Sequence, residues 1–125
     1  MEQSPKTLTF VVPAYNMETY LERCVESLLS ATDNSDIEVL IVDDGSSDST
    51  PELADMYERR WPGNVRAIHQ VNKGHGGAVN TGIANATGMY VKVVDADDWV
   101  DMPSIDTLMG TLRVQRVATD PVDMI

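Results

Sequence analysis

Apolar runs and amphipathic stretches alternate along the chain. A run rich in β-branched residues occupies 7–12 and is followed by Pro13, which predicts a strand that stops at the proline. Apolar side chains then recur at helical spacing from Met17 to Ala31, which predicts an amphipathic helix. The next run, Ile37–Val42, is nearly all apolar and predicts a strand that is buried on both faces.

The same alternation continues to the end of the chain. After a turn over 43–48, the predicted elements are a helix from Thr50 to before Pro62, a strand over 65–71, a glycine-rich loop over 72–77, a short helix ending at Gly88, a strand over 89–94 and a helix from Pro103. Residues 121–125 have the pattern of a further strand that is cut off. Strands that alternate with helices predict an α/β fold, a mostly parallel sheet with helices on both faces.

Polar segments follow each of the predicted strands. Right-handed crossover connections place the carboxyl ends of parallel strands at one edge of the sheet. We therefore expect four segments to converge at this edge, where open α/β sheets bind their ligands: 13–16, 43–48, 72–77 and 95–98.

The last of these segments carries three carboxylates in four residues, Asp95, Asp97 and Asp98. Carboxylates held this close together repel one another unless a positive group lies between them. A hard divalent cation with oxygen ligands, often bound together with a phosphorylated substrate, is one explanation. An acidic turn that leads into the next helix is another, and this segment alone leaves both open.

The other segments also have two interpretations each. Asp43 and Asp44 follow a buried strand, where they contact a ligand or belong to a capped turn. The glycines from Gly74 onward allow a ligand to approach the backbone closely, or only form a tight turn. His75 is a candidate ligand or proton donor, or else a solvated loop residue. Trp99 stacks on a sugar or covers the sheet edge.

Composition limits the class of protein. The chain has 125 residues, which predicts one domain over 1–125, and 20 acidic against 9 basic residues give a net charge of −11. This charge argues against nucleic acid as a partner, because a nucleic-acid binder needs a basic face. No apolar stretch approaches the ~20 residues that span a bilayer. With a single cysteine and no signal sequence, we expect a cytoplasmic protein, and membrane association of a longer parent chain stays open.

Several nucleotide and metal chemistries fit poorly. A dinucleotide-binding fold needs G-x-G-x-x-G directly after its first strand, where this chain has Pro13–Asn16. The sequence contains no G-x-x-x-x-G-K-[ST] phosphate-binding loop. It has no set of cysteines and histidines with the spacing of a zinc site.

Four motifs together resemble family 2 glycosyltransferases, which have the GT-A fold. They are FVVPAYNME from Phe10, EVLIVDDGSSDST from Glu38, NKG to AVNTG from Asn72 and VDADD from Val94. They occur in the order of the family and cover about residues 7–100. One such motif alone is weak, whereas four in order are specific.

The resemblance implies a site for a nucleotide-diphosphate sugar, with a UDP-sugar favoured. The sugar would pass to a hydroxyl of a carbohydrate or lipid-linked acceptor, usually with inversion, as in cell-envelope polysaccharide biosynthesis. By the family pattern, the nucleotide-sugar-binding residues are Pro13, Ala14, Tyr15, Glu18, Asp44, Lys73, Gly74, Asp95 and Ala96. Mg²⁺ or Mn²⁺ would be bound by Asp97 together with Asp95.

One family feature has no counterpart in the chain. In the family, the general base lies on a later segment near the acceptor, so we expect it beyond Ile125, in an acceptor-binding half that follows a truncated GT-A sheet. We therefore expect a hexosyltransferase domain that is inactive alone, and an open sheet edge near 122–125 that favours homo-oligomers. The alternatives are a sugar-nucleotide nucleotidyltransferase and a non-catalytic binding module of the same fold.

Overall fold

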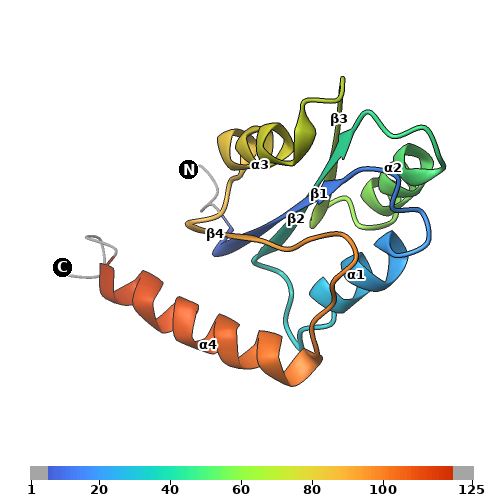
Figure 1. The fold of residues 1–125 in the computed structure, drawn as a ribbon. Helices are drawn as coiled ribbons and strands as arrows, with labels where there is room; N and C mark the ends of the chain where they lie inside the picture. Colours follow the sequence, from blue (N-terminus) through green and yellow to red (C-terminus); the bar gives the residue numbers. More distant parts are fainter. Residues whose placement is uncertain (1–5, 120–125) are drawn as a thin grey trace.

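Strands and helices alternate along residues 6–119, the part of the chain that the computed structural model describes (Figure 1). The strands are β1 (Leu8–Ala14), β2 (Ile37–Asp44), β3 (Val65–Gln70) and β4 (Tyr90–Val93). The helices are α1 (Leu21–Leu28), α2 (Thr50–Arg60), α3 (Gly74–Asn85) and α4 (Met102–Thr119). Among these helices, none is long and apolar enough to cross a membrane.

The strands form one sheet in the order β3-β2-β1-β4, and every pair is parallel. Leu8 of β1 lies opposite Ile37 of β2 on one side and Tyr90 of β4 on the other. The chain therefore adds strands first on one side of β1 and then on the other. Such a reversal of strand order opens a crevice at the carboxyl ends of the strands. The predicted parallel α/β sheet is confirmed.

Helices cover both faces of the sheet, as predicted (Figure 1). On one face, Phe10 and Val12 of β1 pack with α1, α2 and α4, and the largest buried side chains of these helices include Leu28, Tyr57 and Met109. On the other face, Val11 of β1 packs with Leu40, Val42 and Ala78, which brings in α3. The alternation of β1 side chains between the two faces is the period-2 pattern of a strand.

Helix α1 is shorter than predicted. Its buried residues Leu21, Cys24, Val25 and Leu28 have helical spacing, but Tyr20 is exposed. The residues before Leu21 form a turn, in which the carbonyl of Met17 accepts the N–H groups of Tyr20 and Leu21. The N–H of Met17 donates to the hydroxyl of Thr50, the first residue of α2, so this segment is tied to the start of α2 instead of extending α1.

Two strands extend beyond their predicted ends. β1 continues through Pro13 to Ala14, because β4 pairs only with Leu8–Val11 and the proline nitrogen faces the open space past the end of β4. β2 continues through Asp43 and Asp44, which were predicted as a turn, because β3 provides partners opposite both residues. Both extensions carry candidate site residues into the sheet, where the backbone is fixed.

The glycine-rich segment and β4 also differ from the prediction. Residues from Gly74 onward were predicted as a loop, but they form the first turn of α3. Ile83 of this helix is exposed, and Gly82 packs against Val11. β4 is an apolar run, yet its Val91 and Val93 are exposed, because α3 covers β1 and β2 and β4 is the sheet edge within residues 6–119. The strand predicted over 121–125, with its expected role in oligomers, lies outside the described residues.

Candidate functional site

A cavity of about 370 Å³ lies at the carboxyl ends of the strands. It is lined by Pro13, Ala14, Tyr15, Met17, Asp44, Asn72, Gly74, His75, Ala78, Asp95, Ala96 and Asp97. All four segments that were expected to converge contribute to this lining. Its position is the crevice that the reversal of strand order creates.

The segment after β1 forms one wall of the cavity. Pro13 and Ala14 are buried in the strand, and Tyr15 is the first exposed residue. Asn16 has a φ of 54°, in the left-handed region that asparagine tolerates. Its N–H donates to Ser46 Oγ at 2.9 Å, and its Oδ1 accepts the N–H of Ser47 at 2.8 Å. These reciprocal bonds fix the loop after β1 to the loop after β2.

Glu18 lies outside the lining of the cavity, although the resemblance implied a role in binding. Its N–H donates to Asp48 Oδ2 at 3.2 Å, and its own carboxylate accepts the N–H of Ser49 at 2.8 Å. The next residue, Thr50, accepts the N–H of Met17 through its hydroxyl at 2.8 Å. In the structure, Glu18 therefore helps to hold the loop after β1 against the loop after β2, outside the cavity lining.

Asp44 is the buried carboxylate of the cavity, with 3% of its surface exposed. Its Oδ1 accepts the backbone N–H of Lys73 at 2.7 Å and Gln70 Nε2 at 2.9 Å. Its backbone carbonyl accepts Asn72 Nδ2 at 3.0 Å. Within the described residues Oδ2 makes no hydrogen bond, so this oxygen can accept one from a bound molecule.

The segment before α3 contributes backbone more than side chains. Gly74 has a φ of 81° and lines the cavity, which fits the expected close approach of a ligand to the chain. Lys73 donates its N–H to Asp44, but its side chain lies outside the cavity lining and would contact a Cβ at position 77. The role in nucleotide-sugar binding that the resemblance implies for Lys73 stays a prediction; in the structure, its backbone N–H holds Asp44.

Asp95 and Ala96 close the cavity on the β4 side. Ala96 is buried in the core, and the N–H of Asp98 donates to the carbonyl of Asp95 at 2.9 Å, which forms a tight turn. His75 Nε2 lies 3.1 Å from Asp95 Oδ1. The turn thus exposes carboxylates on a backbone that the core holds in place.

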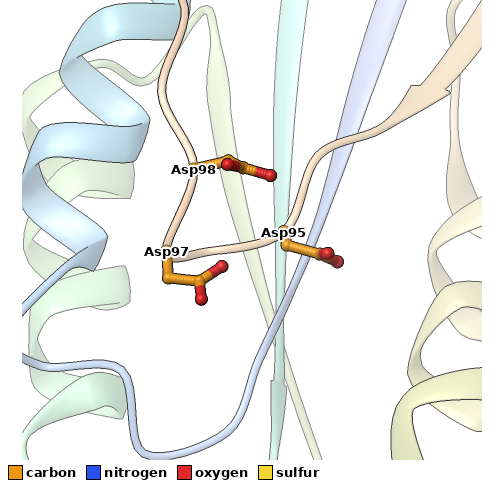
Figure 2. Close-up of side chains that lie close together, drawn as sticks. All are labelled: Asp95, Asp97 and Asp98. Atoms are coloured by element: carbon orange, nitrogen blue, oxygen red, sulfur yellow. The ribbon is translucent and has the colours of Figure 1, made fainter.

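The side chains of Asp95, Asp97 and Asp98 lie close together on this turn (Figure 2). One carboxylate oxygen from each lies within 4.8 Å of the others, and all three residues are exposed. Two oxygens on opposite sides of a cation, each about 2 Å from it, are about 4 Å apart. Small rotations of these side chains would therefore bring the three oxygens to distances at which one cation can bind them. The donor set is all oxygen, which suits Mg²⁺ or Mn²⁺.

Cys24 lies behind this acidic turn and is not a nucleophile. Its thiol is buried and donates to the carbonyl of Asp95 at 3.6 Å. Burial, followed by the negative charges of Asp98, Asp97 and Asp95, raises the pKa of this thiol to about 12. The group stays protonated at neutral pH, as expected for a core cysteine.

Some lining residues were not singled out from the sequence. Met17 and Ala78 reach the cavity from the loop after β1 and from α3; both lie within the family motifs, but neither was assigned a role in binding. The sequence indicated Asn72 only as part of the glycine-rich segment. In the structure, its Oδ1 accepts the N–H of Gly74 at 3.2 Å. An asparagine before a glycine with positive φ is a turn signal that would have identified it.

The chain is similar to known proteins over most of its length. The model of the family described as glycosyl transferase family 2 matches residues 9–120. The "Uncharacterized glycosyltransferase EpsJ" of Bacillus subtilis is 45% identical over 93 residues, which are 74% of this chain and 26% of EpsJ.

Two solved structures extend the similarity to the fold. S. aureus TarS in complex with UDP-GlcNAc superimposes with a TM-score of 0.77 and 27% identity, over 86% of this chain and 31% of that one. Mannosyltransferase PcManGT from Pyrobaculum calidifontis, in complex with GDP-Man and Mn²⁺, gives a TM-score of 0.73 and 26% identity, over 94% of this chain and 35% of that one. The chain thus spans about a third or less of each of these proteins.

Proposed function

The chain belongs to glycosyl transferase family 2, and from this premise we propose that it binds a nucleotide-diphosphate sugar for transfer to an acceptor hydroxyl. A single observation carries the proposal. One cavity at the carboxyl ends of the strands is lined both by the buried carboxylate of Asp44 and by the exposed carboxylates of Asp95 and Asp97. The base or ribose of a nucleotide diphosphate suits the carboxylate of Asp44, and its phosphates suit a cation bound by Asp95 and Asp97.

The nucleoside is assigned to the wall formed by β1, β2 and the start of α3. The free Oδ2 of Asp44 accepts a hydrogen bond from a base N–H or a ribose hydroxyl. Pro13, Ala14 and Tyr15 provide an apolar and aromatic surface, and Gly74 allows close approach of the backbone. The TarS complex holds UDP-GlcNAc and the PcManGT complex holds GDP-Man, so a pyrimidine and a purine both occur among similar proteins. We propose a UDP-sugar as the donor.

Mg²⁺ or Mn²⁺ is assigned to Asp97 together with Asp95. The spacing and exposure of these carboxylates suit a hard cation that keeps open positions for phosphate oxygens. Such an ion supplies positive charge where the diphosphate leaves. PcManGT, a similar protein, forms its complex with GDP-Man together with Mn²⁺, which supports this choice of ion.

Transfer itself is proposed for the whole protein, as hexosyl transfer with inversion to a carbohydrate or lipid-linked acceptor. The chain spans about a third of the TarS and PcManGT chains. We propose that the acceptor pocket and the general base lie on residues that the described part does not include. A missing base alone slows such a reaction by about 10²–10⁴-fold. The 125-residue chain is expected to bind the donor without robust transfer.

Calorimetry with UDP, in the presence of Mn²⁺ and after chelation with EDTA, tests this function. We expect binding that depends on the metal, with GDP as the second nucleotide to compare. The variant Asp97→Asn should weaken metal-assisted binding by roughly tenfold or more, since even residues that only support metal ligands contribute about that much. Its melting temperature without metal should be unchanged or higher, because one of three repelling charges is removed.

Asp101→Asn is the matched control for this variant. Asp101 lies in the same connection before α4, and its Oδ1 accepts the N–H of Ser104 at 2.8 Å, which an asparagine oxygen also does. We expect this control to bind UDP like the parent chain. A marked loss of stability in metal-free Asp97→Asn would instead make Asp97 a structural residue, and absence of binding to both nucleotides would contradict the proposed site.

A further inference from the structure

His69 of β3 lies between two carboxylates at the edge of the sheet that carries the cavity. Its Nδ1 is 2.8 Å from Asp43 Oδ2, and its Nε2 is 2.7 Å from Asp55 Oδ1. A neutral imidazole has one N–H and can donate to one of these oxygens, whereas an imidazolium donates to both. The geometry therefore favours the charged ring, which ties the end of β2 to α2.

A series of hydrogen bonds connects His69 to the loops that form the cavity. Asp43 is buried, and its other oxygen, Oδ1, accepts the N–H of Ser46 at 3.1 Å. Ser46 Oγ in turn accepts the N–H of Asn16 in the loop after β1. Asp44, the carboxylate that lines the cavity, is the residue next to Asp43 in the strand. His69 itself does not line the cavity, so its connection to the site runs through Asp43.

Two charged groups face the ring, Asp43 from β2 and Asp55 from α2. Glu52 and Arg59, one turn away on either side of Asp55 in α2, are exposed to solvent. The hydrogen bonds to Asp43 and Asp55 raise the pKa of His69 above its usual value, against a smaller opposing effect of burial. Because the pKa is raised in the folded state, the stabilisation is fully present below about pH 6.5 and is lost as the pH rises through the folded-state pKa.

We propose that protonated His69 is a positioning residue that holds the Asp43–Ser46 turn, and with it Asp44, in the geometry that binds the nucleotide. Donor affinity then decreases as the ring loses its proton, which makes donor binding sensitive to pH. This inference rests on the proposed nucleotide site. It concerns a residue outside the cavity lining.

The protonation state is tested without any ligand. An NMR titration of the ring carbons should give His69 a pKa above 6.5, and Asp55→Asn, which removes one charged partner, should lower it. The parent chain should be more stable than His69→Gln at pH 6, and this difference should shrink by pH 8.5, because glutamine is neutral and replaces at most one of the two contacts. A His69 pKa at or below 6.5, or a constant stability difference, overturns the proposal.

The effect on the site is tested by UDP binding with Mn²⁺ between pH 5.5 and 8.5. The chain has two histidines, so the comparison is made between His75→Gln and the double variant His69→Gln/His75→Gln, in which the other imidazole is absent. Ionisation of UDP, and of carboxylates that do not contact residue 69, affects both proteins equally. Their affinities should differ by roughly twofold to tenfold at low pH, the fold-change that corresponds to one net hydrogen bond, and should converge as the pH rises.

The possible outcomes separate this inference from the proposed function. Parallel pH profiles for the two proteins, with a raised His69 pKa, overturn the positioning role and leave the nucleotide site intact. Failure of the parent chain to bind either UDP or GDP contradicts the proposed function, and the titration and stability measurements then still decide the protonation of His69. Profiles that converge, together with a raised pKa, support both.

Discussion

The carboxylate of Asp44 accepts the backbone N–H of Lys73, with 2.7 Å between oxygen and nitrogen. This bond joins the end of β2 to the residue before α3. It uses Oδ1, which also accepts a hydrogen bond from Gln70 Nε2, and Oδ2 makes none within residues 6–119. One side chain thus holds two segments of the cavity together and offers a contact to whatever binds there.

Asp44→Asn should separate these two roles. The asparagine oxygen keeps both hydrogen bonds of Oδ1. Because neither donor loses its acceptor, we expect the free energy of unfolding to change by less than about 1 kcal/mol. The new Nδ2 is a donor where the ligand needs an acceptor. UDP affinity should therefore fall by roughly tenfold or more, the loss of a hydrogen bond to a charged group.

Asp44→Ala is the comparison that identifies the structural role. It leaves the N–H of Lys73 and the amide of Gln70 without their acceptor, so urea denaturation should show a loss of about 1–3 kcal/mol. Glu22→Gln, an exposed carboxylate on α1, serves as the control for loss of charge. If Asp44→Asn binds UDP like the parent chain, Asp44 supports the fold but does not contact the nucleotide.

The architecture was largely predictable because it depends on local patterns. Apolar runs gave the strands, helical spacing gave the helices, and their alternation required parallel pairing. The convergence of four polar segments followed from that topology, and the cavity lining contains residues of all four. Glu18 and Lys73 were assigned by family resemblance, which places a residue in a segment but does not determine where its side chain points.

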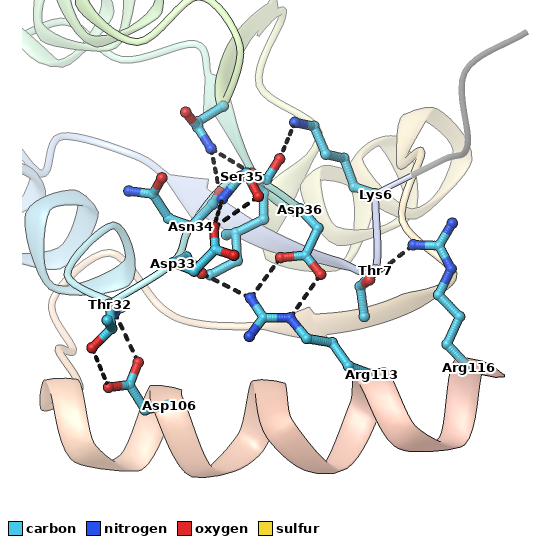
Figure 3. A network of polar contacts seen from close by, with 12 residues as sticks. Lys6, Thr7, Thr32, Asp33, Asn34, Ser35, Asp36, Asp106, Arg113 and Arg116 are labelled. Atoms are coloured by element: carbon cyan, nitrogen blue, oxygen red, sulfur yellow. Dashed lines mark hydrogen bonds and ion pairs between the residues drawn. The ribbon is translucent and has the colours of Figure 1, made fainter. Parts of the chain in front are cut away.

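The polar contacts between distant segments were not predictable, because they depend on register and on the angle at which helices pack. Asp36 pairs with Arg113 through both carboxylate oxygens, at 3.0 and 2.7 Å, and so fixes α4 to the residues before β2 (Figure 3). The sequence places Arg113 on the predicted helix from Pro103, but it does not indicate which acidic residue the guanidinium contacts. The contacts of His69 with Asp43 and Asp55 were not predictable for the same reason, because they depend on how β3, β2 and α2 pack together.

The close contact of α3 with the sheet gives a second prediction. A Cβ on Gly82 would lie 2.3 Å from Val11 Cγ1, deep in the core between α3 and β1. We expect Gly82→Ala to reduce the free energy of unfolding by about 1–3 kcal/mol, the usual effect of overpacking.

Gly110→Ala is the matched control, because Gly110 is also helical and a Cβ there meets no atom within 4 Å. This variant should be more stable by up to about 1 kcal/mol, the difference in helix propensity between the two residues. Thermal denaturation of both variants measures the contrast. Equal effects would show that α3 can move away from β1 at little cost.

A third prediction concerns Glu38, a buried carboxylate in the middle of the sheet. It lies in β2 with 4% of its surface exposed. Its Oε1 accepts hydrogen bonds from Thr9 Oγ1 at 2.7 Å and from the N–H and hydroxyl of Thr87 at 3.0 Å. Its Oε2 accepts Arg66 Nε at 2.7 Å. The residue therefore links β1, β2, β3 and the connection between α3 and β4.

Burial alone raises the pKa of the Glu38 carboxyl, but its hydrogen bonds to Thr87, Thr9 and Arg66 together outweigh burial and lower it. Because the pKa is lowered in the folded state, the stabilisation is fully present above the unfolded value of 4.5 and is lost as the pH falls through the folded-state pKa.

Glu38→Gln places an amide donor among donors and should reduce the free energy of unfolding by about 1–3 kcal/mol at pH 7. Urea denaturation of both proteins from pH 7 to pH 3 should show this difference shrinking below about pH 4.5, since protonation makes the parent side chain neutral as well. A difference that stays constant down to pH 3 would mean that the variant acts through packing, and that the ionised carboxylate contributes nothing to the link between the strands.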